Sequence, residues 1–143
     1  MLMANEEQVA VLSQGAAVWN QWRRDNLDAA INLRRAEIRK ANLTRTNLSV
    51  AMLSGSKLYL ADLSGADLSF AYLCYANLRD ANLSRVRIYN VDLSGANLRS
   101  ADIQNAALSG AKLRSADLSG TNLRSADIYN VHISGADLSS AGL

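Results

Sequence analysis

A leucine or isoleucine recurs at every fifth residue from Leu33 to Leu143, without one interruption. These central positions are Leu33, Ile38, Leu43, Leu48, Leu53, Leu58, Leu63, Leu68, Leu73, Leu78, Leu83, Ile88, Leu93, Leu98, Ile103, Leu108, Leu113, Leu118, Leu123, Ile128, Ile133, Leu138 and Leu143. Two residues before each lies a small or apolar residue, usually alanine. Regularity of this kind is the signature of a repeat architecture.

A five-residue step fits neither a helix nor a straight strand. On a helix the step rotates by about 500°, so the leucines would spiral around it and form no face. On a strand an odd step places successive side chains on opposite sides. The chain must therefore turn a corner within each repeat to bring the next Ala-x-Leu pair inward. Four corners close a square coil of about twenty residues, and coils stacked at about 4.8 Å form a solenoid of just under six coils.

The corner position, two residues after each central leucine, favours turns with positive φ. It holds Gly55, Gly65, Gly95, Gly110, Gly120 and Gly135, and also Asn90, Asn105 and Asn130. Glycine accepts the positive φ of a type II turn freely, and asparagine tolerates it. Val50, Leu60 and Phe70 occupy the same position and resist that conformation, so we predict type I-like corners at these three residues.

The repeat resembles the pentapeptide-repeat family, whose consensus is Ala-Asp/Asn-Leu-x-x. The motif reads Ala-Asn-Leu at 41–43, Ala-Asp-Leu at 61–63 and 66–68, and Ala-Asn-Leu at 76–78, 81–83 and 96–98. The resemblance covers about four fifths of the chain. It implies an all-β solenoid, a right-handed quadrilateral β-helix. The family favours phenylalanine at many central positions, whereas this chain uses none there, which predicts a uniformly narrow core.

The N-terminal segment predicts a helix from Asn5 to about Arg24. Asn5 is a suitable N-cap, and Gln8 completes an approximate capping box. Val9, Leu12, Ala16 and Trp19 follow at helical spacing and form one apolar stripe. We interpret this helix as a cap on the first coil, although the pair Trp19 and Trp22 would also suit a docking face for a partner helix. The predicted organisation is a capping helix and junction at 1–27 and the β-helix at 28–143.

Composition limits the remaining functions. The chain has 143 residues and a net charge of +2, with one cysteine and no proline. One cysteine excludes an internal disulfide framework, and the absence of a long apolar run argues against a membrane span. The N-terminus has acidic rather than basic residues, unlike a secretory signal. We therefore expect a cytoplasmic protein.

Stacking at a period of about twenty residues predicts one exposed apolar and aromatic patch. The patch consists of Val50, Met52, Phe70, Tyr72 and Tyr75. Patches of this kind often mark interaction sites, but the same side chains could simply shield the turns between coils. We keep both interpretations open at this point.

A basic collar marks the first coils, with Arg34, Arg35, Arg39, Lys40 and Arg45 against a single acid, Glu37. A nucleic acid or an acidic partner could bind such a collar. No aromatic residues are interleaved with it, so the sequence favours solvated surface over nucleic-acid binding.

Candidate chemistry is sparse. Acidic and amide residues precede many central leucines, and such side chains readily bond nearby backbone groups in turns, so we interpret them as structural. Cys74 and His132 are the only residues of their types and lie about three coils apart. They cannot form a nucleophilic pair, and metal-ligand spacing is missing. We expect no catalytic residue, no metal site and no cofactor.

The last repeats end at Leu143 with no predicted helix or charged cap, so the C-terminal end of the core is expected to be open. Either two such ends meet in a homodimer, or a longer natural chain continues.

Two function classes follow. The main prediction is a non-enzymatic interaction module, a rigid solenoid that presents its surface to a protein partner. The alternative follows from a branch of the family that the chain resembles, the proteins that mimic duplex DNA and bind DNA gyrase. A DNA mimic needs a negative field along its length, whereas this chain is nearly neutral and basic at one end.

Overall fold

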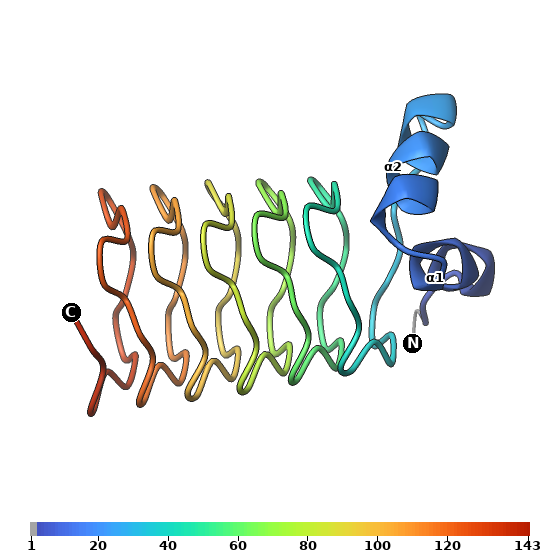
Figure 1. The fold of residues 1–143 in the computed structure, drawn as a ribbon. Coiled ribbons are helices and arrows are strands. Elements are labelled where there is room, and N and C mark those ends of the chain that lie inside the picture. Colours follow the sequence, from blue (N-terminus) through green and yellow to red (C-terminus); the bar gives the residue numbers. More distant parts are fainter. Residues whose placement is uncertain (1–2) are drawn as a thin grey trace.

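The computed structural model describes residues 3–143, which form two short helices followed by a long solenoid (Figure 1). Helix α1 spans Glu6–Ser13 and helix α2 spans Ala16–Asp25. The helices lie at one end of the solenoid, and Leu143 lies at the other. No helix among the described residues is long and apolar enough to cross a membrane.

The solenoid is held together by isolated parallel β-bridges, with no strand longer than a single bridge in the described residues. Each bridge joins residues that are twenty apart, as Met52 with Tyr72 and Tyr72 with Asp92. Around each bridge, successive backbone N–H groups donate alternately to the coil before and to the coil after. For example, the N–H of Leu53 donates to the carbonyl of Tyr72 at 2.7 Å, and the N–H of Tyr72 donates to the carbonyl of Ala51 at 3.0 Å. The twenty-residue coil predicted from the leucine spacing is therefore present.

The central leucines and isoleucines form a continuous core along the solenoid axis. Leu33, Leu53 and Leu73 are fully buried, and the alanines two residues before the central positions line the same interior. The space left along the axis between the leucines is only about 10 Å³, which leaves no comfortable room for a water molecule. A narrow core is what a repeat without phenylalanine at its central positions predicts.

The prediction of type I-like corners at Val50, Leu60 and Phe70 is wrong. Their φ angles are 56°, 60° and 61°, and every corner from Arg35 to Ser140 has positive φ whichever residue occupies it. From Arg35 to Gly120 the corner N–H bonds to the next coil, and the last four corners keep the same φ without that bond. At Val50, Leu60 and Phe70 the bond explains why the local preference does not decide the turn. The N–H of Val50, for instance, donates to the carbonyl of Ser69 at 2.9 Å. A different turn at one corner would break that bond and shift the register of the coil, so tertiary hydrogen bonding overrides local preference.

The acidic and amide residues before the central leucines bond their own turns, as predicted. The Asp62 carboxylate accepts a hydrogen bond from the backbone N–H of Ser64 at 3.0 Å, and Asp92 does the same with Ser94 at 3.1 Å. The pattern repeats along the solenoid. These side chains therefore have a structural role in the turn.

The predicted single helix is two helices, because the chain breaks at Gly15, whose φ of 103° is outside the helical region. Asn5 caps α1 as predicted and accepts from the N–H of Gln8 at 3.1 Å. The Gln8 side chain does not complete a capping box. It turns to the first coil instead, where its amide donates to the carbonyl of Ala30 at 2.9 Å and accepts from the N–H of Asn32 at 2.8 Å.

A second amide pairs with the edge of the first coil in the same way. Asn20 of α2 donates to the carbonyl of Arg45 at 3.1 Å and accepts from the N–H of Asn47 at 2.8 Å. The indole N–H of Trp19 adds a bond of 2.7 Å to the carbonyl of Asn47. Two side-chain amides thus take the place of backbone peptides from a missing coil, and they satisfy polar groups that the edge would otherwise expose.

Candidate interaction surface

The predicted patch residues do come together on one side of the solenoid. Met52 and Tyr72 form a β-bridge, and Val50 lies one coil from Phe70 at the same corner. Val50 and Phe70 are each 55% exposed, and Tyr72 is 54% exposed, whereas Met52 is half-buried. The patch is therefore an accessible surface on a backbone held by hydrogen bonds on both sides.

Tyr75 lies at the neighbouring corner, where its ring covers a glycine of the next coil. A Cβ added to Gly95 would lie 2.5 Å from Cε1 of the Tyr75 ring. The ring is still 78% exposed, so Tyr75 lies along the surface and extends the patch across one face of the solenoid.

Sequence reasoning missed part of this surface. The corner that carries Val50 and Phe70 has no charged residue in any coil, and it also presents Tyr89 and Tyr129, which are 40% and 78% exposed. Its members are Ser49, Val50, Ser69, Phe70, Tyr89, Asn90, Ser109, Gly110, Tyr129 and Asn130. We call this row the uncharged corner. The twenty-residue period applied to every row, rather than to the patch alone, would have found it.

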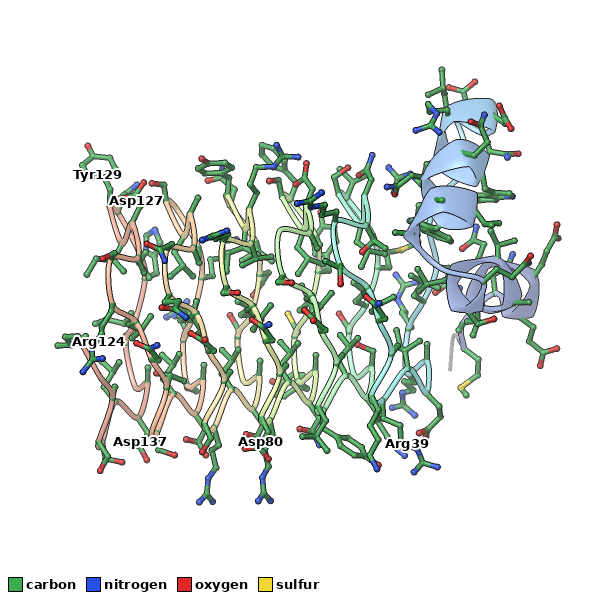
Figure 2. The ribbon with its side chains drawn as sticks, in the orientation of Figure 1. Arg39, Asp80, Arg124, Asp127, Tyr129 and Asp137 are labelled. Carbon is green, nitrogen blue, oxygen red and sulfur yellow. The ribbon has the colours of Figure 1, made fainter. Side chains whose placement is uncertain are left out.

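The basic collar is a ring around the first coil. Arg34 and Arg35 lie at one corner, Arg39 and Lys40 at the next, and Arg45 at the third. The Arg39 guanidinium donates to the Tyr59 hydroxyl at 3.1 Å, and Figure 2 shows Arg39 and Tyr129 projecting from opposite edges of the solenoid. Five cations distributed over three corners do not form one flat contact surface.

Charges elsewhere are partly paired along the coils. Arg87 forms a salt bridge of 2.9 Å with Asp67 one coil earlier, and Lys57 pairs with Glu37 in the same way. Burial opposes ionisation of Asp67, but hydrogen bonds from Ser69 and the positive charge of Arg87 hold the pKa of its carboxyl below the usual value. Pairing of this kind keeps the field along the solenoid weak.

Cys74 and His132 lie apart, as predicted. The bridges from Tyr72 through Asp92 and Lys112 to His132 put three coil steps between their positions. Partial burial, with the nearby carboxylate of Asp92, raises the pKa of the Cys74 thiol, which is the opposite of what a nucleophile needs. Within residues 3–143 no cluster of three or more His, Cys, Asp or Glu side chains could hold a metal ion.

The C-terminal end of the core opens to solvent. Ile128 and Ile133 are 58% and 47% exposed, and Leu143 is 86% exposed. With Leu138 and Leu123 they line an apolar cavity of about 420 Å³ at the end of the stacked leucines. The same repeat positions that are buried in earlier coils are thus accessible here.

A four-sided coil of this kind, with short parallel bridges and a leucine core, defines a β-solenoid repeat protein. The family described as pentapeptide repeats matches the sequence in eight copies, over residues 31–69, 61–99 and 101–139. The chain therefore belongs to the pentapeptide-repeat family, and the members of known structure that resemble it form right-handed quadrilateral β-helices.

A solved structure agrees with this assignment. The pentapeptide-repeat protein alr5209 from Nostoc PCC 7120 is 33% identical, with a TM-score of 0.57 over 71% of this chain and 84% of that one. Rfr23 from the cyanobacterium Cyanothece 51142 is 35% identical over 68% of this chain and 63% of its own, with a TM-score of 0.47. No curated protein matches the sequence.

QnrB1, a plasmid-mediated fluoroquinolone resistance protein, has a TM-score of 0.68 at 22% identity, over 73% of this chain. That likeness establishes a shared fold. The chain spans 63% of the length of Rfr23 and 57% of the length of QnrB1.

Proposed function

We propose that this protein is a non-enzymatic interaction module, a rigid rod of about six coils that presents the patch around Phe70 and Tyr72 to a protein partner in the cytoplasm. The observation that carries the proposal is the exposure of Val50, Phe70, Tyr72 and Tyr75 together on one side. A backbone that is hydrogen-bonded to the coils on both sides needs little further ordering when its exposed aromatic side chains bind, which favours tight contacts. In this proposal the two N-terminal helices act as the cap of the rod.

The uncharged corner supports this assignment. A partner with an uncharged apolar surface could approach Val50 and Phe70 without removing water from any charged group of that row, and desolvating an unpaired charge is costly. The other corners carry arginines or lysines. A partner that docks there would need matching carboxylates, whereas the patch requires only apolar complementarity.

The test is a pull-down with the native protein beside the Phe70→Ser/Tyr72→Ser variant. Both side chains are half exposed, so the variant should keep the fold, which circular dichroism can verify. We expect the native protein to retain a partner that the variant loses. A control, Tyr129→Ser, changes a still more exposed ring at the far end of the uncharged corner. Identical partner sets for the native protein and the double variant would refute the patch as the binding site.

Self-association through the C-terminal cavity is a second part of the proposal. Two copies meeting at Ile128, Ile133, Leu138 and Leu143 would bury apolar side chains that are exposed in the single chain, in a symmetric contact. Sedimentation of the native protein and of an Ile133→Ser/Leu138→Ser variant tests this. We expect the native protein to sediment as a dimer and the variant as a monomer. If both sediment as monomers, self-association through this end is refuted.

Binding to DNA gyrase as a mimic of duplex DNA is the competing function. The carboxylates lie mostly on the faces of the coil and the cations at three of the four corners, so positive and negative side chains alternate around the rod. A mimic requires a uniformly negative field. Added protein should therefore leave gyrase supercoiling unchanged at micromolar concentration, whereas inhibition, or relief of quinolone inhibition, would favour mimicry over the scaffold.

A further inference from the structure

A polar groove lies on the face that carries Tyr72, displaced along the solenoid toward the C-terminal end. The bridges continue from Tyr72 to Asp92, Lys112 and His132, so these side chains follow one another along one face. The groove has a volume of about 710 Å³, within the range of small-molecule sites. It is lined by Asp92, Ser94, Lys112, Arg114, His132, Ile133 and Ser134.

The cations in this groove form no close salt bridge with any described residue, although Lys112 is the bridge partner of Asp92. Burial opposes ionisation of the Asp92 carboxyl, but hydrogen bonds from Ser94 and the positive charge of Lys112 help to lower its pKa. The salt bridges among the described residues involve Glu37, Asp67 and Asp80, and none involves Lys112 or Arg114. Arg114 makes one long contact, in which its Nε donates to the Ser134 hydroxyl at 3.4 Å. That contact directs the guanidinium toward the coil that carries His132 and leaves its terminal nitrogens free to donate.

The one carboxylate in the groove is already engaged. Asp92 accepts from the backbone N–H of Ser94 at 3.1 Å, in the turn contact that its counterparts make in other coils. Because Lys112 and Arg114 outnumber it, the groove has a net positive charge even with a neutral imidazole. The Ser134 hydroxyl adds an uncharged donor at the end of the groove away from Asp92.

We propose that this groove binds a phosphate monoester, with Lys112 and Arg114 as charged donors and with His132 and the Ser134 hydroxyl as further donors. Lys112 and His132 are bridge partners, so their side chains leave the sheet about 4.8 Å apart. A phosphate group has three terminal oxygens and up to two negative charges, so it can accept from several such donors at once. A carboxylate has only two oxygens and uses the row of donors less fully. The guanidinium fork adds a paired contact that a lysine alone cannot make.

This site is separate from the proposed protein-binding patch, and it requires a different ligand. Tyr72 ends the patch at the coil before Asp92, and none of the patch residues lines the groove. Loss of one function therefore need not affect the other.

The chain itself provides a direct probe. His132 is the only histidine, so its imidazole C–H signals can be identified in a proton NMR spectrum without assignment of the rest. Inorganic phosphate is added at fixed pH, with sodium chloride adjusted to hold the ionic strength constant. We expect a saturable shift of the His132 signals. The Lys112→Gln/Arg114→Gln variant, which loses two charge-assisted hydrogen bonds, should bind at least about tenfold more weakly.

The control is Arg124→Gln, which removes one exposed arginine at a different corner. We expect the control to bind phosphate as the native protein does, while the double variant binds it more weakly. A second titration with a nucleoside 5′-monophosphate distinguishes the two sources of the phosphate group. If the nucleotide binds more tightly than inorganic phosphate, the rest of the groove contacts the nucleoside. If the two bind equally, the site recognises the phosphoryl group alone. The proposal would be overturned if the His132 signals did not move or moved without saturation. It would also be overturned if Arg124→Gln weakened phosphate binding as much as the double variant does.

Discussion

Ser56 provides the sharpest test of how the core is built. Its side chain is fully buried, and its hydroxyl is the one buried side-chain polar atom without a hydrogen-bond partner among the described residues. The coils on either side carry Ala36 and Ala76 at the equivalent position, both of them buried. Ser56→Ala therefore completes a uniform alanine row, removing one oxygen atom and leaving no cavity of consequence.

The expected effect is a gain in stability. A buried polar group left unsatisfied costs about 1–3 kcal/mol, so we expect Ser56→Ala to stabilise the protein by about 1 kcal/mol or more. For a chain of this length the unfolding entropy is about 0.3 kcal/mol/K, which makes a gain of 1 kcal/mol worth about 3 °C in Tm.

Thr46 is the matched control, because it occupies the same inward repeat position on another side of the coil and is equally buried, but its hydroxyl has a partner. Its hydroxyl donates to the carbonyl of Leu43 at 2.7 Å, so Thr46→Val, which keeps the shape, should cost about 1 kcal/mol. Urea titration followed by circular dichroism measures both variants against the native protein. The reasoning fails if Ser56→Ala destabilises the protein as Thr46→Val does, since the Ser56 hydroxyl would then have a partner in solution.

Three further predictions concern the corners and one carboxylate. Val50→Asn should raise the unfolding free energy by about 1 kcal/mol, because a β-branched residue is strained at positive φ and asparagine is not; a loss in urea titration would contradict this. Gly95→Ala should destabilise the protein by about 1–2 kcal/mol, because residue 95 has a φ of 70° and the new Cβ would collide with the Tyr75 ring. Gly120→Ala should cost less in the same titration, because the nearest atom to its new Cβ is 3.5 Å away. Finally, the Asp67 carboxyl has a lowered pKa, so its contribution to stability is complete above its unfolded-state pKa of about 4 and is lost as the pH falls through the lower, folded-state value. Thermal unfolding across this acid range should show a weaker pH dependence for Asp67→Asn, and an unchanged dependence would show that the carboxylate is not involved.

The placement of the patch followed from the period alone. Once coils of twenty residues are accepted, Val50 must lie beside Phe70 and Met52 beside Tyr72, and the bridges agree. The phosphate-binding groove could not be found in the same way. The period places Lys112 next to His132, but only the side-chain directions reveal a hollow there and free donors within it.

The leucine period by itself determined which side chains face inward, because no straight element can bury every fifth residue, whereas a chain that turns a corner in each repeat can. The bridges between residues twenty apart show that four repeats close one coil. Local preference could not decide the corners. Val50, Leu60 and Phe70 adopt positive φ because the N–H of each corner is committed to the coil beyond it, a constraint that no short stretch of sequence contains. The roles of the polar side chains in the two N-terminal helices were also decided by the tertiary structure. Gln8 and Asn20 could have been ordinary helix-surface amides, and only contact with the open edge of the first coil makes them its hydrogen-bond partners.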